Sequence, residues 1–206
     1  MFYEMRTYDI APGTTDEFLK RVEEALPHRV HLSPMVAMWR TEIGPLNQLI
    51  HVWPYEDLNE RARIRAEASK NPNWPPSTGD VVLNMQSDIM TPAPFMRPLT
   101  AEVQELGNIY EMRIYTYRPG TMPTVIERWA ESVPHREKYS PLAACWYTEI
   151  GGLNKFYHIW AYKDLADRTR VRAEATKDPH WPPQTREFVL KQENKILVPA
   201  LFSPLR

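Results

Sequence analysis

The chain is an internal duplication. Residues from Tyr3 onward align without a gap with residues from Tyr110 onward, and close to half of the aligned positions are identical. Identity at a fixed period over this length indicates repeated copies of one structural unit. We therefore expect two domains, residues 1–100 and residues 108–206, joined by a polar linker at residues 101–107.

Both copies show the same order of expected elements. In the first copy, alternating aromatic stretches predict strands and apolar stripes at helical spacing predict helices. The expected strands are 3–10, 35–43, 48–55 and 87–91, the main helices are 14–27 and 57–71, and a short helix is expected at 81–83. This β-α-β-β-α-β order is the ferredoxin-like plan of an α+β protein.

The sequence indicates where the two main helices of the first copy begin and where the first of them ends. Thr14 and Asp57 each precede an acidic residue three positions later, which is the pattern of a capping box. Pro27 is expected to end the first helix because proline has no backbone N–H to donate. We place His28, and its repeat counterpart His135, just past that helix end.

A four-stranded sheet with both helices on one face leaves its other face uncovered. Two such sheets can bury these faces against each other, as a sandwich or a closed barrel. The duplication supplies the second sheet within the same chain. We therefore predict an intramolecular, pseudo-dimeric α+β barrel, with further homo-oligomer formation left open.

The bulk charge excludes several classes of partner. There are 25 Lys and Arg residues against 26 Asp and Glu residues, which gives a net charge of -1. This balance does not indicate nucleic-acid binding, and no apolar run is long enough to suggest membrane insertion. The single cysteine, Cys145, cannot form an intramolecular disulfide. We expect a cytoplasmic protein.

The first strand of each copy carries polar side chains on one face. These are Glu4, Arg6 and Tyr8 in the first copy and Glu111, Arg113 and Tyr115 in the second. A carboxylate and a guanidinium two residues apart share a strand face, so they could orient a polar substrate. The alternative is an ion pair that serves the architecture alone.

The third strand of each copy carries a histidine and a tryptophan in phase. They are His51 and Trp53, repeated as His158 and Trp160. A histidine beside aromatic side chains suits a mostly apolar pocket with one proton-transfer group, so the two histidines are the candidate catalytic residues. The alternative is a core histidine hydrogen-bonded to a neighbour.

Further candidates extend this lining. Trp39 and Trp146 on the second strand of each copy are expected to add aromatic surface, and His28 and His135 are expected at the pocket mouth. The alternative for His28 and His135 is a cation that stabilises a helix C-terminus. The arginines of the second helix either form a solvated, salt-bridged face or recognise an anion at the pocket entrance.

Several stretches together resemble a known family. They are the strand Tyr3–Tyr8, the segment Pro27–Arg29, the strand pair Trp39–Gly44 and His51–Tyr55, and the Arg-rich second helix. In each copy they resemble the NIPSNAP family, over nearly the whole chain. The resemblance implies the dimeric α+β barrel superfamily, whose members include cofactor-free monooxygenases, haem-dependent enzymes and small ligand-binding proteins. It implies no firmly assigned chemistry.

These observations favour a protein that binds a small, largely apolar molecule in one pocket per repeat. The sequence has acid–base groups but no glycine-rich phosphate loop and no Cys or His pair at zinc spacing, so we expect no cofactor and no metal. If the protein is an enzyme, a cofactor-independent oxidation or isomerisation fits best. The alternatives are a non-catalytic interaction platform and a haem- or metal-binding barrel.

Overall fold

The computed structural model describes residues 1–206 as two similar halves. The first half contains β1 (Phe2–Ile10), α1 (Thr15–Ala25), α2 (Pro27–Val30), β2 (Ala37–Ile43), β3 (Gln48–Tyr55), α3 (Leu58–Ala68) and β4 (Val82–Pro92). The second half contains β5 (Ile109–Tyr117), α4 (Met122–Arg136), β6 (Leu142–Ile150), β7 (Lys155–Tyr162), α5 (Leu165–Ala175) and β8 (Val189–Pro199). No helix has the length and apolar character needed to span a membrane.

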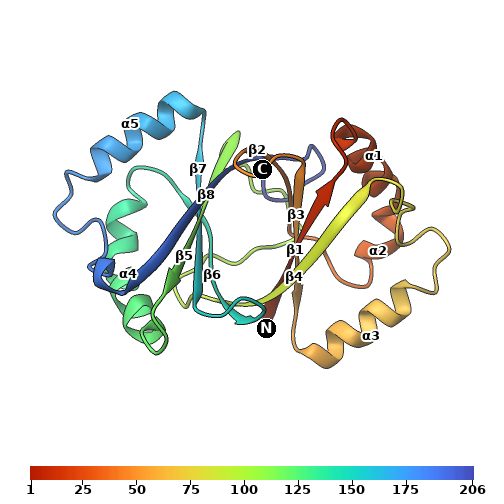
Figure 1. Ribbon diagram of the computed structural model, residues 1–206, viewed down its shortest axis with the longest axis horizontal. Coiled ribbons are helices and arrows are strands. Elements are labelled where there is room, and N and C mark those ends of the chain that lie inside the picture. Colours follow the sequence, from red (N-terminus) through yellow and green to blue (C-terminus); the bar gives the residue numbers. More distant parts are fainter.

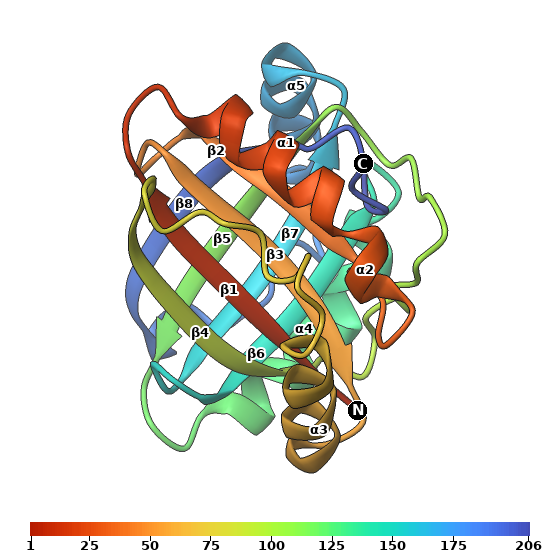
Figure 2. The same ribbon diagram turned by 90° about the vertical axis from the view of Figure 1, so that its right-hand side faces the viewer.

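The eight strands close into one barrel in the order β1-β3-β2-β8-β5-β7-β6-β4. Each half contributes four neighbouring strands, and two antiparallel seams join the halves, β2 with β8 and β4 with β6. Figure 1 shows the two sheets facing each other, with α1 to α3 on one flank and α4 and α5 on the other. In Figure 2 the helices of the first half cover the outer face of β1 to β4. The predicted fold class is confirmed.

The barrel interior is a packed apolar core. A cluster of 20 buried residues from both halves fills it, including Tyr3 and Met5 from β1 and Trp39 from β2. The alternation of β1 turns Glu4 and Arg6 to the opposite, outer face. Each sheet therefore has one face in the barrel core and one face toward its own helices.

Trp39 and Trp146 lie inside this core, which corrects the expectation that they line a pocket with the histidines. Both indoles are fully buried, and Trp39 packs against Tyr110 of the other repeat with ring centroids 5.9 Å apart. The reason is the strand register. Trp39 pairs with Ile50, whose side chain points into the barrel, and its neighbour Met38 pairs with His51.

The predicted helix caps were right in one case and wrong in the other. The Asp57 carboxylate accepts the Glu60 N–H at 2.8 Å at the start of α3, as predicted. Thr14 makes no side-chain cap to α1, and its hydroxyl instead donates to the Ala11 carbonyl at 2.7 Å. The Thr14 side chain is therefore turned toward the preceding loop instead of the first turn of α1.

Proline ends the first helix in one copy only. In the first half, α1 ends at Ala25 and Pro27 begins the short helix α2. In the second half, Pro134 lies inside α4, which continues to Arg136. A proline removes one backbone hydrogen bond, and the bond from the Glu137 N–H to the Val133 carbonyl is still made beyond it. His28 and His135 are consequently helical residues.

The last strand of the first half is longer than predicted. β4 begins at Val82, where a short helix was expected, and continues for 11 residues rather than covering only 87–91. Its first part is exposed, with Leu83 and Met85 open to solvent, and its apolar residues do not follow a clean strand alternation. Pairing with β1 from Val82 to Met90 defines it instead. The preceding helix, α3, also ends earlier than expected, at Ala68.

We predict that neither half is stable alone as a monomer. A half expressed as residues 1–100 or 108–206 would expose one wall of the barrel core and the unpaired edges of two strands. Each should appear as a dimer or aggregate in size-exclusion chromatography with light scattering, and mixing the halves should restore a 1:1 complex. Cooperative unfolding of a monomeric half at the midpoint of the full chain would contradict this.

Candidate ligand-binding pockets

Each repeat has a pocket between the outer face of its sheet and its helices. The pocket of the first repeat measures about 600 Å³ and that of the second about 700 Å³. Equivalent residues line both, namely Arg6, Tyr8, Arg29, His51, Trp53, Arg65 and Trp74 in the first and Arg113, Tyr115, Arg136, His158, Trp160, Arg172 and Trp181 in the second. The barrel core is thus separate from the two pockets.

A hydrogen bond from a tryptophan fixes which ring nitrogen of each pocket histidine carries the proton. The Trp53 Nε1–H donates to His51 Nδ1 at 2.6 Å, and the Trp160 Nε1–H donates to His158 Nδ1 at 2.8 Å. An imidazole nitrogen that accepts a hydrogen bond carries no proton, so the neutral ring carries its proton on Nε2. Strand alternation places donor and acceptor two residues apart on one face.

Both histidines are held in the neutral form. Burial, followed by the positive charge of Arg6, lowers the pKa of His51 to about 3. Burial and the charge of Arg113 lower the pKa of His158 well below its ordinary value. His158 is only 2% exposed, and its Nε2 has no hydrogen-bond partner in the protein. A buried N–H donor therefore lacks an acceptor in the lining of the second pocket.

Beneath each pocket lies a fully buried carboxylate surrounded by arginines. Glu4 is 0% exposed, and its Oε1 accepts from Arg6 at 2.9 Å, from Arg61 at 2.7 Å and from the Ser87 hydroxyl at 2.7 Å. Burial would raise the pKa of Glu4, but the hydrogen bonds from Arg61 and Ser87 and the arginine charges outweigh it and lower the pKa to about 2. Arg65 lies 4.0 Å from the other carboxylate oxygen.

The second repeat builds the same network on Glu111. Arg113, Arg168 and Arg172 all form ion pairs with this buried carboxylate. Burial would raise the pKa of Glu111, but these arginines lower it below its ordinary value. The arginines of α3 and α5 therefore bind the sheet rather than forming a purely solvated helix face. One of each set, Arg65 or Arg172, also reaches the pocket.

Two buried arginines in the lining were not among the predicted site residues. The Arg29 guanidinium stacks 4.5 Å from the centre of the Trp53 ring and donates to the Tyr55 hydroxyl at 3.1 Å. Arg136 repeats the arrangement, 4.4 Å from the Trp160 ring. Arg29 continues the helical spacing of the buried residues Phe18, Val22 and Ala25. The assumption that Pro27 stops the helix concealed that signal.

His28 and His135 do not reach the pockets, which corrects their expected place at the pocket mouths. His28 points away from the pocket that Arg29 lines, and it lies in a separate depression with Arg21 and Asn73. His135 contacts Asp178 and His180. Adjacent helical residues point about 100° apart, so a buried arginine turns its neighbouring histidine outward.

The Trp-Pro-Pro loops form the outer wall of each pocket. Trp74 packs edge-on against Trp53 with ring centroids 6.0 Å apart, and Trp181 lies 5.6 Å from Trp160 in the same way. Trp74 and Trp181 also line the two pockets, so these loops contribute to the lining as well as to packing.

Both repeats match a known protein family. The family model of NIPSNAP matches the chain twice, over residues 3–97 and 110–204. The chain belongs to the NIPSNAP family. Human NipSnap homolog 3A is 26% identical to it over 100% of this chain and 86% of the relative. Mouse NipSnap homolog 2 is 28% identical over 99% and 76%.

Solved structures agree on the architecture of this NIPSNAP protein. A Lactobacillus acidophilus protein provisionally described as a monooxygenase superposes on 96% of the chain and 93% of its own, with a TM-score of 0.67 and 10% sequence identity. At that identity the likeness concerns the fold alone.

The two NIPSNAP repeats have diverged around the conserved histidine. Val22 in the first pocket is replaced by Trp129, whose ring lies 4.4 Å from His158. Met38, opposite His51, is replaced by Cys145, opposite His158. Burial raises the pKa of the Cys145 thiol well above its ordinary value, so it packs as a small apolar side chain. The two pockets thus share the histidine, its tryptophan and three arginines, but the second adds Arg186 and Lys191 and the apolar walls differ.

The pocket histidines should make the stability of this NIPSNAP protein depend on pH. The pKa of His51 is lowered from 6.5 to about 3, so the unfolded chain binds a proton that the folded chain does not. Stability should therefore fall as the pH drops below about 6.5, by up to about 1.4 kcal/mol per pH unit for each such histidine.

Urea unfolding between pH 6.5 and pH 4.5 tests this, because the ordinary glutamate pKa of 4.5 lies at the end of that window. The double variant His51→Gln and His158→Gln should flatten the pH slope. An unchanged slope in the variant would show that the imidazoles are not held neutral.

Proposed function

We propose that each repeat binds a small organic anion with a flat apolar body, in the pocket between its sheet and its helices. The observation that carries this proposal is the charge of the linings. Arg6, Arg29 and Arg65 line the first pocket without any Asp or Glu. The lining of the second pocket has Arg113, Arg136, Arg172, Arg186 and Lys191, again without a carboxylate.

The arginines around each pocket carry more positive charge than the buried glutamate neutralises. Glu4 compensates one of the three arginines that contact it, and Arg29 lies against Trp53 and Tyr55 without a carboxylate partner. Guanidinium groups offer paired donors that match a carboxylate or phosphate. An anion entering the pocket would complete this charge balance.

The neutral histidine adds a second recognition group. With Nδ1 occupied by tryptophan, Nε2–H of His158 is a donor with no protein acceptor. A histidine whose pKa is far below neutral is a weak base. We therefore assign His51 and His158 the role of hydrogen-bond donors to the ligand in the resting protein, in preference to proton abstraction.

The walls suit a flat apolar body. In the first pocket Trp53 and Trp74 stand edge to face, and Phe18, Val22 and Met38 form the side below α1. In the second pocket Trp129 and Trp181 stand edge to face with ring centroids 5.5 Å apart. Aromatic surfaces bind flat rings by stacking and by edge contacts. An aromatic or conjugated carboxylate has both the negative charge that the arginines favour and the flat body that these walls fit.

We predict that the protein binds aromatic acids in preference to matched neutral and cationic compounds. Isothermal titration with benzoate, benzamide and benzylamine, and with the corresponding naphthalene compounds, separates charge from shape. Each acid should bind at least tenfold more tightly than its amide, which corresponds to about 1.4 kcal/mol. Equal affinity for acid and amide, or no binding of any acid, would contradict the proposal.

Paired variants locate the binding. Arg65→Gln with Arg172→Gln removes one pocket charge from each repeat and should weaken acid binding about tenfold or more. Arg63→Gln with Arg170→Gln is the matched control, because these arginines lie on the same helices with more exposed side chains and line neither pocket. An equal loss in both double variants would indicate general electrostatic attraction instead of a site.

A further inference from the structure

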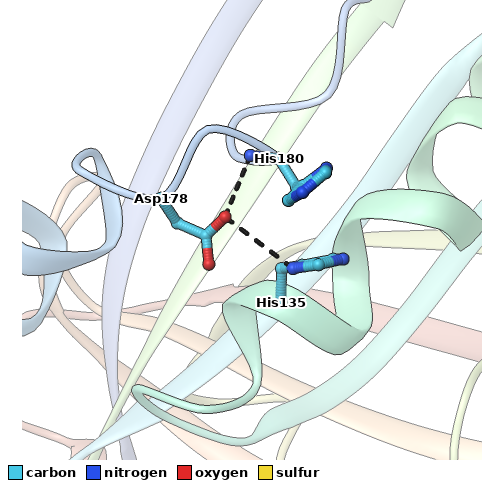
Figure 3. Close-up of side chains that lie close together, drawn as sticks. All are labelled: His135, Asp178 and His180. Carbon is cyan, nitrogen blue, oxygen red and sulfur yellow. Dashed lines mark hydrogen bonds and ion pairs between the residues drawn. The ribbon is translucent and has the colours of Figure 1, made fainter.

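A second group of polar side chains lies outside the pockets and occurs in the second repeat only. His135 lies near the end of α4, and Asp178 and His180 lie on the loop that follows α5 (Figure 3). One ligand atom from each residue lies within 4.8 Å of the others. His135 Nδ1 is 3.7 Å from Asp178 Oδ1, and the two imidazole rings are stacked with centroids 4.1 Å apart.

We propose that His135, Asp178 and His180 form a binding site for one divalent transition-metal ion such as Zn²⁺. Two imidazoles and one carboxylate are a donor set that Zn²⁺ uses, with water in the fourth position. Bonds of about 2.0–2.1 Å in a tetrahedral site separate neighbouring donor atoms by about 3.3 Å. The 3.7 Å between His135 and Asp178 is close to that separation.

The local structure holds the Asp178 carboxylate in place, and the two imidazoles can adjust to a bound ion. Asp178 accepts the backbone N–H of His180 at 2.9 Å through Oδ1, which orients the carboxylate toward α4 (Figure 3). His180 is exposed, so its ring can rotate out of the stack to present a nitrogen. Lys138 Nζ lies 3.5 Å from His135 Nδ1. Its flexible stem allows the ammonium to swing away when a cation binds.

The first repeat provides an internal comparison. The positions that match His135, Asp178 and His180 are His28, Asn71 and Asn73. His28 and Asn73 line the same depression, so the first repeat has a similar arrangement with one imidazole and two amides. An amide is a far weaker zinc ligand than an imidazole or a carboxylate. The donor set is therefore complete in the second repeat only.

The site would act on the pocket next to it. His135 precedes Arg136, and His180 precedes Trp181, and both of these neighbours line the second pocket. An ion bound by His135 and His180 would tie α4 to the Trp-Pro-Pro loop and hold that pocket wall in place. The stabilisation should appear as a higher melting temperature when metal is added.

Zinc titration of the full chain tests the proposal. After treatment with a chelator and removal of any affinity tag, calorimetry and native mass spectrometry should show one Zn²⁺ per chain. His180→Asn and Asp178→Asn, which copy the first repeat, should each weaken binding at least tenfold. His28→Asn is the matched control and should leave the affinity unchanged. Zn²⁺ at a hundred times its Kd should raise the melting temperature by about 5–10 °C.

Two outcomes would overturn the site. One is binding of less than one equivalent of Zn²⁺ to the wild-type chain. The other is wild-type affinity in both His180→Asn and Asp178→Asn, given metal-free melting temperatures that show all variants fold.

The reverse substitutions Asn71→Asp and Asn73→His should give the first repeat a site of its own. A second bound ion supports the proposal, and no second ion counts against it.

Discussion

The buried carboxylates of Glu4 and Glu111 are the interactions on which the pocket architecture depends. A carboxylate with no solvent exposure is costly unless it is paired and hydrogen-bonded, and in each repeat three arginines lie within ion-pairing distance of it. Two of those three come from α3 or α5, so the requirement to compensate one strand residue fixes the helix over the sheet. It also leaves Arg65 and Arg172 facing the pocket with charge that the carboxylate does not neutralise.

Barrel closure explains why the pockets lie where they do. Pairing of β2 with β8 and of β4 with β6 encloses one face of each sheet, and aromatic and aliphatic side chains fill that space. Only the outer faces remain for a ligand. The alternation of side chains along β1 supplies both the barrel core and the ligand site. Tyr3 and Met5 belong to the core. Glu4, Arg6 and Tyr8 belong to the site.

The sequence was sufficient for the fold because duplication and strand alternation are local, visible patterns. It was also sufficient to group His51 with Trp53 on one face of β3, and Glu4 with Arg6 on one face of β1, because each pair lies two residues apart on a single strand. It failed where the answer depended on contacts between segments. Whether Trp39 faces the core follows from its pairing with Ile50, which no local pattern reveals. Arg29 was missed because a proline was assumed to end a helix whose buried face continues past it.

The divergence between the repeats separates what the site requires from what it can vary. The histidine, its tryptophan donor and the buried glutamate are identical in both copies, as are the pocket arginines at the positions of Arg6, Arg29 and Arg65. These groups are linked through hydrogen bonds or charge. Some of the apolar neighbours have changed, as Val22 and Trp129 show. This change of wall residue alters pocket shape without removing a hydrogen-bond partner of the buried glutamate or of the pocket histidine. A duplicated barrel can therefore keep one recognition chemistry while giving its two pockets different shapes.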